Sequence, residues 1–316
     1  MIRVSDLTKR YGQKTAVDGV SFSVGAGEVV GFLGPNGAGK STTLRVIAGF
    51  LAPTSGQVTL GGFDVVEEPL AAKKMLGYMP ETVPLYPEMR VVEYLAYRAE
   101  LKGVPRAGRA AAVDEAMTRA RVDDVAGTLI GRLSKGYRQR VGFADVLVAK
   151  PPVLVLDEPT AGLDPNQIRD VRATIRELGR TCAVLLSTHI LSEVEASCDR
   201  VLVLGHGKLL ASGPTAEVAR RGRARRVVAT VRGAPDDVIA AAKSASEVRA
   251  VELLPRGDAD DVTRVLCTFD DAADVDAARE ALAAHLVAAG LGVRELGTDG
   301  GGLEEVFAAL TQGDAP

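Results

Sequence analysis

A glycine-rich stretch near the N-terminus constrains the fold more than any other part of the chain. Residues 28–42 read EVVGFLGPNGAGKST. The apolar run from Val29 to Leu33 breaks into a loop at Gly34, and a helical pattern follows through Ala48. The sequence therefore predicts a buried strand, a tight loop and a helix, in that order.

The spacing within this loop indicates a binding site for a polyphosphate. Gly34 is followed, after four residues, by Gly39, Lys40 and Ser41, which is the Walker A pattern. Successive backbone N–H groups can point into one concavity here, and the helix N-terminus adds partial positive charge. A simple turn rarely needs both a lysine and a hydroxyl at these positions. The residues predicted to bind the nucleotide phosphates are Gly34, Pro35, Asn36, Gly37, Ala38, Gly39, Lys40, Ser41 and Thr42.

Within that loop, two side chains have distinct predicted tasks. Lys40 is placed to reach the β- and γ-phosphates, and Ser41 to put its hydroxyl on Mg²⁺.

A second polar element follows another buried strand. The apolar run after Pro152 ends at Asp157 and Glu158. A carboxylate at the end of a buried strand can hold Mg²⁺ directly or through water, so Asp157 is a predicted metal ligand. Glu158 lies one residue further on, where it could orient or deprotonate an attacking water. An acidic turn without a function would explain this segment equally well by itself, and the phosphate loop decides against it.

Length and composition limit the number of domains, the classes of partner and the cellular location. A chain of 316 residues exceeds what one hydrophobic core usually supports, so two domains are expected. The net charge of −3 gives no general case for nucleic-acid binding. No stretch approaches the roughly 20 apolar residues of a membrane span, and no signal-peptide core is present. The three cysteines are scattered and have no metal-ligand spacing, so we expect a cytosolic protein.

The order of elements predicts an α/β fold. Apolar runs alternate with helical patterns after the phosphate loop, which favours a parallel sheet with crossover helices. Short strands before the loop predict an N-terminal antiparallel β subdomain, and helical spacing over about residues 83–150 predicts a helical insertion.

The character of the sequence changes near residues 213–226, where a glycine, a proline and a basic run occur. We predict a first domain at 1–218, a basic linker at 219–226 and an accessory α+β domain at 227–316. The basic run could contact acidic lipid or nucleic acid, but its lack of aromatic residues favours a solvated linker.

The second domain has the element order βαββαβ, which is typical of a ferredoxin-like unit. It contains no nucleophile, metal cluster or second phosphate loop, so we interpret it as a regulatory or dimer-supporting domain. The predicted elements are strand 227–232, helix 235–244, strand 247–254, strand 262–269, helix 274–289, strand 292–296 and a final helix 303–311.

A third segment, residues 133–140, narrows the class of phosphate-binding protein. Residues 133–140 read LSKGYRQR, with Ser134 and Gly136 at the start of a helix. Such a helix start could bind an anion, although alone it indicates only an N-capped helix. Combined with the phosphate loop and the acidic strand end, it resembles the nucleotide-binding subunits of ATP-binding cassette (ABC) transporters. The resemblance covers about residues 2–218, with the motifs in family order.

The resemblance implies further site residues. Tyr11 matches the aromatic residue that stacks on adenine, and Glu81 occupies the Q-loop position, beside the metal. Residues 161–164 resemble the D-loop, whose Asp164 would communicate across a subunit interface. His189 matches the switch histidine, which would contact the γ-phosphate.

It also implies a mechanism with two subunits. The domains would dimerise head to tail, so that Ser134 and Gly136 of one subunit close on the γ-phosphate held by Lys40 of the other. ATP and Mg²⁺ would be the cofactors, with Ser41, Asp157 and Glu81 as metal-binding residues. Glu158, His189 and Lys40 would be the catalytic residues. Closure would drive a separate integral membrane permease contacted near residues 81–100, which places the subunit on the inner face of the membrane.

Several positions depart from the commonest family pattern. Glu81 replaces a glutamine, so a carboxylate would face Mg²⁺ and either strengthen metal attraction or repel the γ-phosphate. Lys135 and Tyr137 replace a glycine and a glutamine of the signature. With residues 77–81 they resemble the exporter-type branch with separate six-helix permeases, which includes gliding-motility and multidrug-efflux subunits. The final segment 303–311 resembles the closing helix of that branch.

Two other functions compete with this one. A soluble ABC ATPase acting on ribosomes or DNA is the main alternative, but such relatives usually carry two cassettes or a long coiled coil. A non-catalytic, ATP-regulated module is disfavoured by the presence of every predicted catalytic and metal-binding residue.

Overall fold

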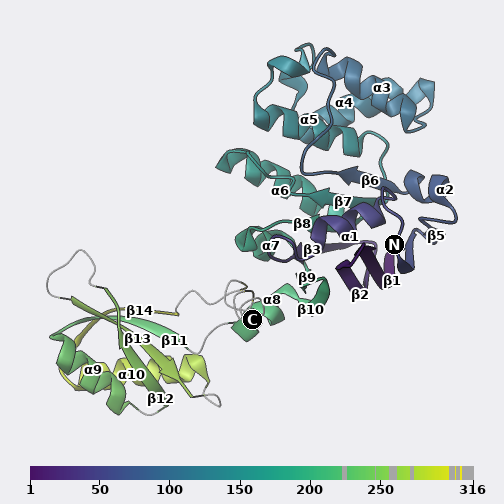
Figure 1. The fold of residues 1–316 in the computed structure, drawn as a ribbon. Helices are drawn as coiled ribbons and strands as arrows, with labels where there is room; N and C mark the ends of the chain where they lie inside the picture. Colours follow the sequence, from purple (N-terminus) through teal and green to yellow (C-terminus); the bar gives the residue numbers. More distant parts are fainter. Residues whose placement is uncertain are drawn as a thin grey trace. The chain divides into compact units, whose positions relative to one another are not determined.

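The chain forms two compact units in a computed structural model (Figure 1). The structure describes residues 1–222, 226–245, 247–255, 262–270 and 274–298, together with Leu303 and Phe307. The first unit is Met1–Ala216 and the second is Glu217–Gln312, so the two divide inside helix α8 (Thr215–Gly222). The functional division at residue 218 and the linker at 219–226 stay predictions, and residues 223–225 lie outside the described ranges.

A six-stranded sheet forms the centre of the first unit. Its strand order is β10-β9-β3-β8-β7-β6, and every adjacent pair is parallel except β10 with β9. Strands β3, β7, β8 and β9 are buried almost throughout, which explains why they are nearly continuous apolar runs. The strands are β3 (Glu28–Leu33), β6 (Leu76–Met79), β7 (Val153–Asp157), β8 (Ala183–Ser187), β9 (Arg200–Gly205) and β10 (Lys208–Pro214).

Side chains alternate between the two faces of the central sheet. Val30 and Phe32 of β3 join the core formed with the N-terminal strands and the helix after the phosphate loop. Gly31 faces the opposite side, where an added Cβ would lie 2.6 Å from a methyl group of Val194. The phosphate loop therefore begins at the end of a strand, β3, whose two faces are both packed against other elements.

An antiparallel sheet with the order β2-β1-β4-β5 completes the core of the first unit, as the sequence predicts. Its apolar side chains pack with those of β3, β7 and β8 in one cluster. The strands are β1 (Ile2–Tyr11), β2 (Lys14–Val24), β4 (Ser55–Leu60) and β5 (Phe63–Asp64).

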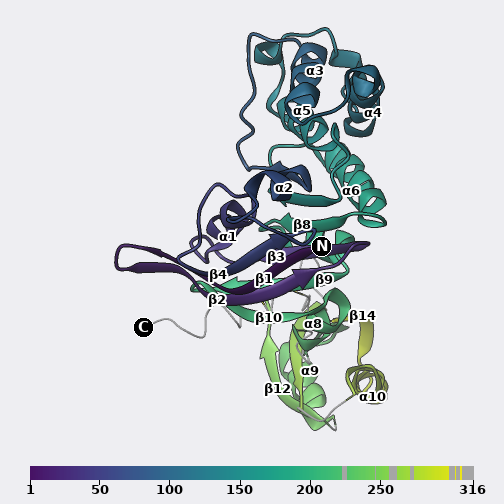
Figure 2. The same cartoon turned by 90° about the vertical axis from the view of Figure 1, so that its right-hand side faces the viewer.

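Helices connect the strands and form the predicted helical insertion, where α3, α4 and α5 lie together (Figure 2). The first unit contains α1 (Lys40–Ile47), α2 (Pro69–Lys74), α3 (Val91–Leu101), α4 (Arg109–Ala120), α5 (Lys135–Leu147), α6 (Pro165–Gly179) and α7 (Leu191–Ser197).

The structure defines several boundaries and elements. Helix α5 begins at Lys135, directly after Ser134, which caps it, so the signature residues lie at a helix start as the sequence predicts. The segment Gly213-Pro214, where the character of the sequence begins to change, ends β10, and Pro214 pairs with Arg200 of β9. Strands β5, β9 and β10 and helix α2 were not anticipated from the sequence.

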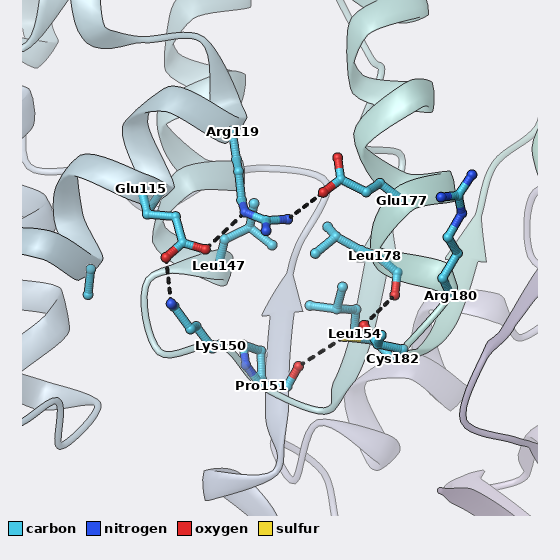
Figure 3. A pocket seen from close by; sticks show the side chains of 13 residues that line it. Glu115, Arg119, Leu147, Lys150, Pro151, Leu154, Glu177, Leu178, Arg180 and Cys182 are labelled. Atoms are coloured by element: carbon cyan, nitrogen blue, oxygen red, sulfur yellow. Dashed lines mark hydrogen bonds and ion pairs between the residues drawn. The ribbon is translucent and has the colours of Figure 1, made fainter.

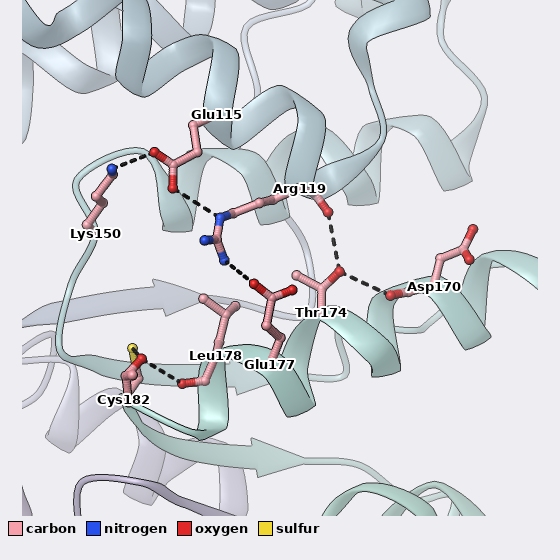
Figure 4. Close-up of polar contacts among 9 residues, drawn as sticks. Glu115, Arg119, Lys150, Asp170, Thr174, Glu177, Leu178 and Cys182 are labelled. Carbon is pink, nitrogen blue, oxygen red and sulfur yellow. Dashed lines mark hydrogen bonds and ion pairs between the residues drawn. The ribbon is translucent and has the colours of Figure 1, made fainter.

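Ion pairs join the helical insertion to the core. Arg119 of α4 lies between Glu115, at 3.1 Å, and Glu177 of α6, at 3.4 Å (Figure 4). Lys150 contacts the other oxygen of Glu115 at 2.5 Å, and the hydroxyl of Thr174 donates to the backbone carbonyl of Arg119. Exposed ion pairs contribute only about 0–1 kcal/mol each, so these pairs add little to the stability of the junction.

The same ion pairs border a cavity of about 440 Å³ (Figure 3). It lies before the first residues of β7 and β8, at the opposite end of these strands from Asp157 and Ser187. Its apolar lining comes from Ala112, Ala116, Leu147, Leu154 and Leu178.

The second unit is built on an antiparallel sheet with the order β14-β11-β13-β12, which is the arrangement expected of a ferredoxin-like unit. Alternate residues of β11 are buried against the two helices. Of the predicted final helix, only Leu303 and Phe307 are described, and both are helical. The elements are β11 (Arg226–Arg232), α9 (Pro235–Ser244), β12 (Val248–Leu253), β13 (Val262–Phe269), α10 (Val275–Ala288) and β14 (Gly292–Thr298).

Candidate functional site

The predicted phosphate loop joins the carboxyl end of β3 to α1. Gly37 and Gly39 adopt left-handed φ values of 83° and 102°, which favour glycine. A Cβ on Gly39 would lie 2.5 Å from the carbonyl oxygen of Ala16, so no larger residue fits there. Gly39 precedes α1 without a side chain to cap it. The N–H groups of the first helical turn are therefore left for an anion.

Lys40 is the first residue of α1, and its ammonium group lies over the loop. Its Nζ donates hydrogen bonds to the carbonyl oxygens of Gly34, at 2.5 Å, and Pro35, at 3.1 Å. Ser41 and Thr42 follow in the first turn and are half-buried. The loop thus presents a lysine and two hydroxyls beside its backbone N–H groups.

Two acids and a histidine meet at the carboxyl edge of the sheet. Asp157 ends β7, is 6% exposed, and lies in register with Ser187 of β8. Oε1 of Glu158 lies 2.9 Å from Nδ1 of His189, which follows β8. The side chain of Glu158 is 12% exposed and that of His189 is 68% exposed, so the imidazole faces solvent while the acid is largely enclosed.

These groups interact electrostatically with the phosphate loop. Burial raises the pKa of Asp157, and the charges of Glu158 and Glu81 raise it further, while Lys40 lowers it. Burial lowers the pKa of Lys40, and the three carboxylates oppose that shift. The carboxylates repel one another, so a cation bound among them would relieve this repulsion.

Glu81 follows β6 and is exposed. It lines a cavity of about 460 Å³ together with Lys135, Arg138 and Gln139 of α5. Among the residues that the structure describes, no group of three or more His, Cys, Asp or Glu is arranged to hold a metal ion alone. The metal-binding role of Glu81 stays a prediction.

The signature residues lie at the start of α5. Ser134 accepts a hydrogen bond from the backbone N–H of Tyr137 at 3.3 Å, and a Cβ on Gly136 would lie 2.7 Å from the side-chain oxygen of Gln167 in α6. Within the described ranges, no hydrogen bond or ion pair joins Ser134 or Gly136 to the phosphate loop. Within one chain, the Lys40 ammonium group donates hydrogen bonds to Gly34 and Pro35 instead.

The substituted signature positions have contacts inside the chain. The Tyr137 hydroxyl donates to the carboxylate of Asp124, and the Arg140 guanidinium lies 4.2 Å from the centre of the Tyr137 ring. The aliphatic part of Lys135 packs beside Gly162, where an added Cβ would be 2.8 Å away. These contacts fasten the signature to the helical insertion and to the D-loop segment.

Two residues implied by the family resemblance lie outside this cluster. Tyr11 ends β1 and is 48% exposed, with the ammonium of Lys9 5.3 Å from its ring centre. Asp164 caps α6 by accepting hydrogen bonds from the N–H groups of Asn166 and Gln167, both at 2.9 Å. The contact of Tyr11 with adenine and the interface role of Asp164 stay predictions.

The sequence alone did not single out two buried polar residues. Gln139 of α5 donates from Nε2 to the carbonyl oxygen of Glu158 at 3.1 Å. Glu193 of α7 accepts from the hydroxyls of Thr160 and Thr188, so it links the segment after β7 to the one after β8. The partner of Gln139 lies 19 residues away in the sequence, and the partners of Glu193 lie 33 and 5 residues away. Both lie among other polar residues of their helices, so the sequence offered no signal that distinguished them.

The Q-loop segment packs tightly against α5. A Cβ on Gly142 would lie 2.5 Å and 2.6 Å from the two methyl groups of Val83. Overpacking costs roughly 1–3 kcal/mol, and the higher helix propensity of alanine returns about 1 kcal/mol. We expect Gly142→Ala to lower the free energy of unfolding by up to about 2 kcal/mol, measured by urea denaturation.

The variant Val83→Ala tests whether the Val83 methyl groups cause this loss of stability. In a Val83→Ala background the methyl groups are gone, so Gly142→Ala is expected to cost far less or to stabilise the protein. An equal cost in both backgrounds would contradict this packing.

A parallel sheet with a glycine-rich phosphate loop after one strand and carboxylates after another defines a P-loop nucleotide-binding protein. Residues 17–161 match the ABC transporter family. By this match and the relatives below, the chain belongs to the ATP-binding subunits of ABC transporters and is an ATPase. The predicted family and α/β fold class are therefore confirmed.

Two relatives match most of the chain. It is 33% identical over 253 residues to the linearmycin resistance ATP-binding protein LnrL of Bacillus subtilis, covering 79% of this chain and 81% of that protein. It is 36% identical over 225 residues to the bacitracin transport ATP-binding protein BcrA of Bacillus licheniformis, covering 71% of this chain and 72% of that protein.

A solved structure supports the same assignment. The ATP binding subunit of an ABC transporter aligns with a TM-score of 0.66 and 31% identity, covering 70% of this chain and 92% of that chain. In the part of the chain that the structure describes, no helix combines the length and apolar character needed to span a membrane.

Proposed function

We propose that this subunit powers export through a separate membrane permease, as one half of a head-to-tail dimer. The observation that carries the proposal is the meeting of Lys40, Asp157, Glu158 and His189, from three segments, at the carboxyl edge of the central sheet. A relative named Nod factor export ATP-binding protein I, from Paraburkholderia xenovorans, supports export as the direction of transport.

Within one subunit, each of these side chains has a proposed task. Lys40 leaves the loop carbonyls of Gly34 and Pro35 and binds the β- and γ-phosphates, which offer stronger, charge-assisted hydrogen bonds. Glu158 accepts a proton from the attacking water, and His189, in contact with that carboxylate, holds the γ-phosphate. Tyr11 offers an exposed ring for adenine.

The donor set near the loop fits Mg²⁺. Ser41 and Asp157 supply hard oxygen ligands, and Glu81 adds a nearby carboxylate. Mg²⁺ usually takes one or two carboxylates and completes its shell with phosphate oxygens and water, which suits a site with few protein ligands of its own. When bound, the ion would neutralise charge on the phosphates.

The proposed dimer would bring the two halves of the site together. Among the described residues, no hydrogen bond or ion pair joins Ser134 or Gly136 to the phosphate loop of their own chain, and a second chain would bring them to the γ-phosphate held by Lys40. Asp164, at the start of α6, would lie close to that interface. Each of the two ATP sites then takes residues from both chains.

An exposed apolar surface on the helical insertion suits the permease. Tyr86 is 42% exposed, Tyr97 40% and Leu101 58%. All three lie in or beside the region 81–100, where the family resemblance places the permease contact. Permease binding would hold the subunit at the inner face of the membrane.

The domain limits belong to the same proposal. Residues 1–218 would bind and hydrolyse ATP, residues 219–226 would connect, and residues 227–316 would regulate the dimer or support it. The ferredoxin-like sheet of the last region has no phosphate loop of its own.

The test is co-expression with a candidate six-span permease, followed by co-purification and ATPase assays in proteoliposomes. We expect the two proteins to co-purify and the permease to change the ATPase rate. Tyr97→Glu should reduce co-purification, whereas Val287→Glu, equally apolar before substitution and 60% exposed on α10, should not. An ATPase rate that responds to RNA or DNA and never to a permease would favour the alternative function instead.

A further inference from the structure

The backbone of Glu158 has an unusual conformation that three hydrogen bonds maintain. Its φ is 51°, in the left-handed region that residues other than glycine rarely occupy. Its N–H donates to the carbonyl oxygen of Ser187 at 2.9 Å. Its carbonyl oxygen accepts from the N–H of Ala161 at 3.1 Å and from Nε2 of Gln139 at 3.1 Å. Such a conformation persists only where the surroundings hold it.

Gln139 provides the one side chain among these three bonds. It is 6% exposed, and a buried amide is costly unless it is hydrogen-bonded. Its partner is not a neighbour on α5 but Glu158, the residue directly after the Walker B strand β7. The bond therefore fixes one helix of the insertion to the turn that carries the proposed general base.

The direction of the Glu158 side chain depends on this backbone conformation. With φ at 51°, the carboxylate reaches Nδ1 of His189 at 2.9 Å. A peptide that relaxed toward a negative φ would rotate the Cα–Cβ bond and carry the carboxylate away from His189. An error of about 1 Å at a catalytic group is enough to slow a reaction substantially.

We propose that Gln139 is a positioning residue for ATP hydrolysis: its amide holds the Glu158 peptide so that the carboxylate faces His189. The proposal rests on the proposed role of Glu158 as the base. Gln139 is also five residues after Ser134 on the same helix. A shift of α5 when Ser134 closes on the partner's γ-phosphate therefore reaches the base of the subunit's own site.

Gln139→Ala and Gln139→Glu test the proposal in the full-length protein. We expect kcat to fall about tenfold in both, because one hydrogen bond contributes about 0.5–1.5 kcal/mol and 1.36 kcal/mol is a factor of ten. KM for ATP should stay within about twofold, since Lys40 and the loop are untouched. A variant that merely loosened the fold would not separate kcat from KM in this way.

A pH profile gives a second, independent readout. The carboxyl introduced by Gln139→Glu can donate to the Glu158 carbonyl only when it is protonated. The ratio of its kcat to that of the wild type should therefore rise as pH falls, while the ratio for Gln139→Ala stays flat. Taking ratios is necessary because Glu81, Lys135 and Arg138 line the same cavity and remain in every variant.

Arg140→Ala is the matched control. Arg140 is the next residue of α5, is 8% exposed, and also donates to a backbone carbonyl, that of Arg121 at 2.7 Å. Arg140→Ala should lower the free energy of unfolding, but the ratio of its kcat to that of the wild type should not change with pH. Unchanged kcat in both Gln139 variants, or the same loss in Arg140→Ala with no pH-dependent ratio for Gln139→Glu, would overturn the proposal. Failure of the wild type to hydrolyse ATP, or an undiminished rate in Glu158→Gln, would instead count against the proposed function.

Discussion

Glu158→Gln is expected to lower ATP turnover by roughly 100- to 10,000-fold while ATP still binds. A positioned general base contributes about that factor, and glutamine keeps the shape of glutamate but cannot accept the proton. Its amide can still contact Nδ1 of His189, which lies 2.9 Å from Oε1 in the native protein. Steady-state hydrolysis and equilibrium binding of ATP, measured on the same preparation, give the two quantities.

The same variant should accumulate as an ATP-bound dimer, because closure without hydrolysis leaves no route to reopening. Size-exclusion chromatography with light scattering detects this state. Glu177→Gln, on α6 and away from the phosphate loop, serves as the control and should turn over normally. Turnover of Glu158→Gln at the wild-type rate would remove Glu158 from the mechanism.

Lys40→Ala is expected to weaken ATP binding by about 10- to 100-fold, because hydrogen bonds to charged groups contribute about 1.5–3 kcal/mol. Burial lowers the pKa of Lys40, but Glu158, Asp157 and Glu81 oppose that shift and favour the charged form that phosphates need. Hydrolysis falls as a consequence of lost binding. Titration with a fluorescent ATP analogue measures the affinity.

A second lysine, Lys73, tests whether the loss of ATP affinity comes from the position of Lys40 or only from the loss of one positive charge. Lys73, exposed in the last turn of α2, carries the same charge, and Lys73→Ala should bind ATP like the wild type. Retained affinity in Lys40→Ala would show that the loop backbone alone holds the phosphates.

Local spacing predicted the parts of the site that one segment forms. The phosphate loop is such a part, because Gly37 and Gly39 supply the positive φ values and Lys40 is the next residue. The acidic end of β7 is another, because a continuous apolar run identifies a buried strand.

Contacts between distant segments could not be predicted in the same way. Gln139 looks like any polar residue in an amphipathic helix until α5 is placed against the end of β7. Asp164 was assigned an interface role by resemblance, and the structure adds a local task as the N-cap of α6. Strand β10 could not be predicted because it is only partly buried and its glycine and proline resemble a linker.

The measurement that tests the central claim most directly is the rate of Mg²⁺-dependent ATP hydrolysis against protein concentration. Two chains must each contribute residues to a site, Lys40 from one and Ser134 from the other, so the rate should rise more steeply than linearly at low concentration and vanish in Glu158→Gln. A rate strictly proportional to protein concentration, from a species that stays monomeric with ATP, would contradict the two-chain site.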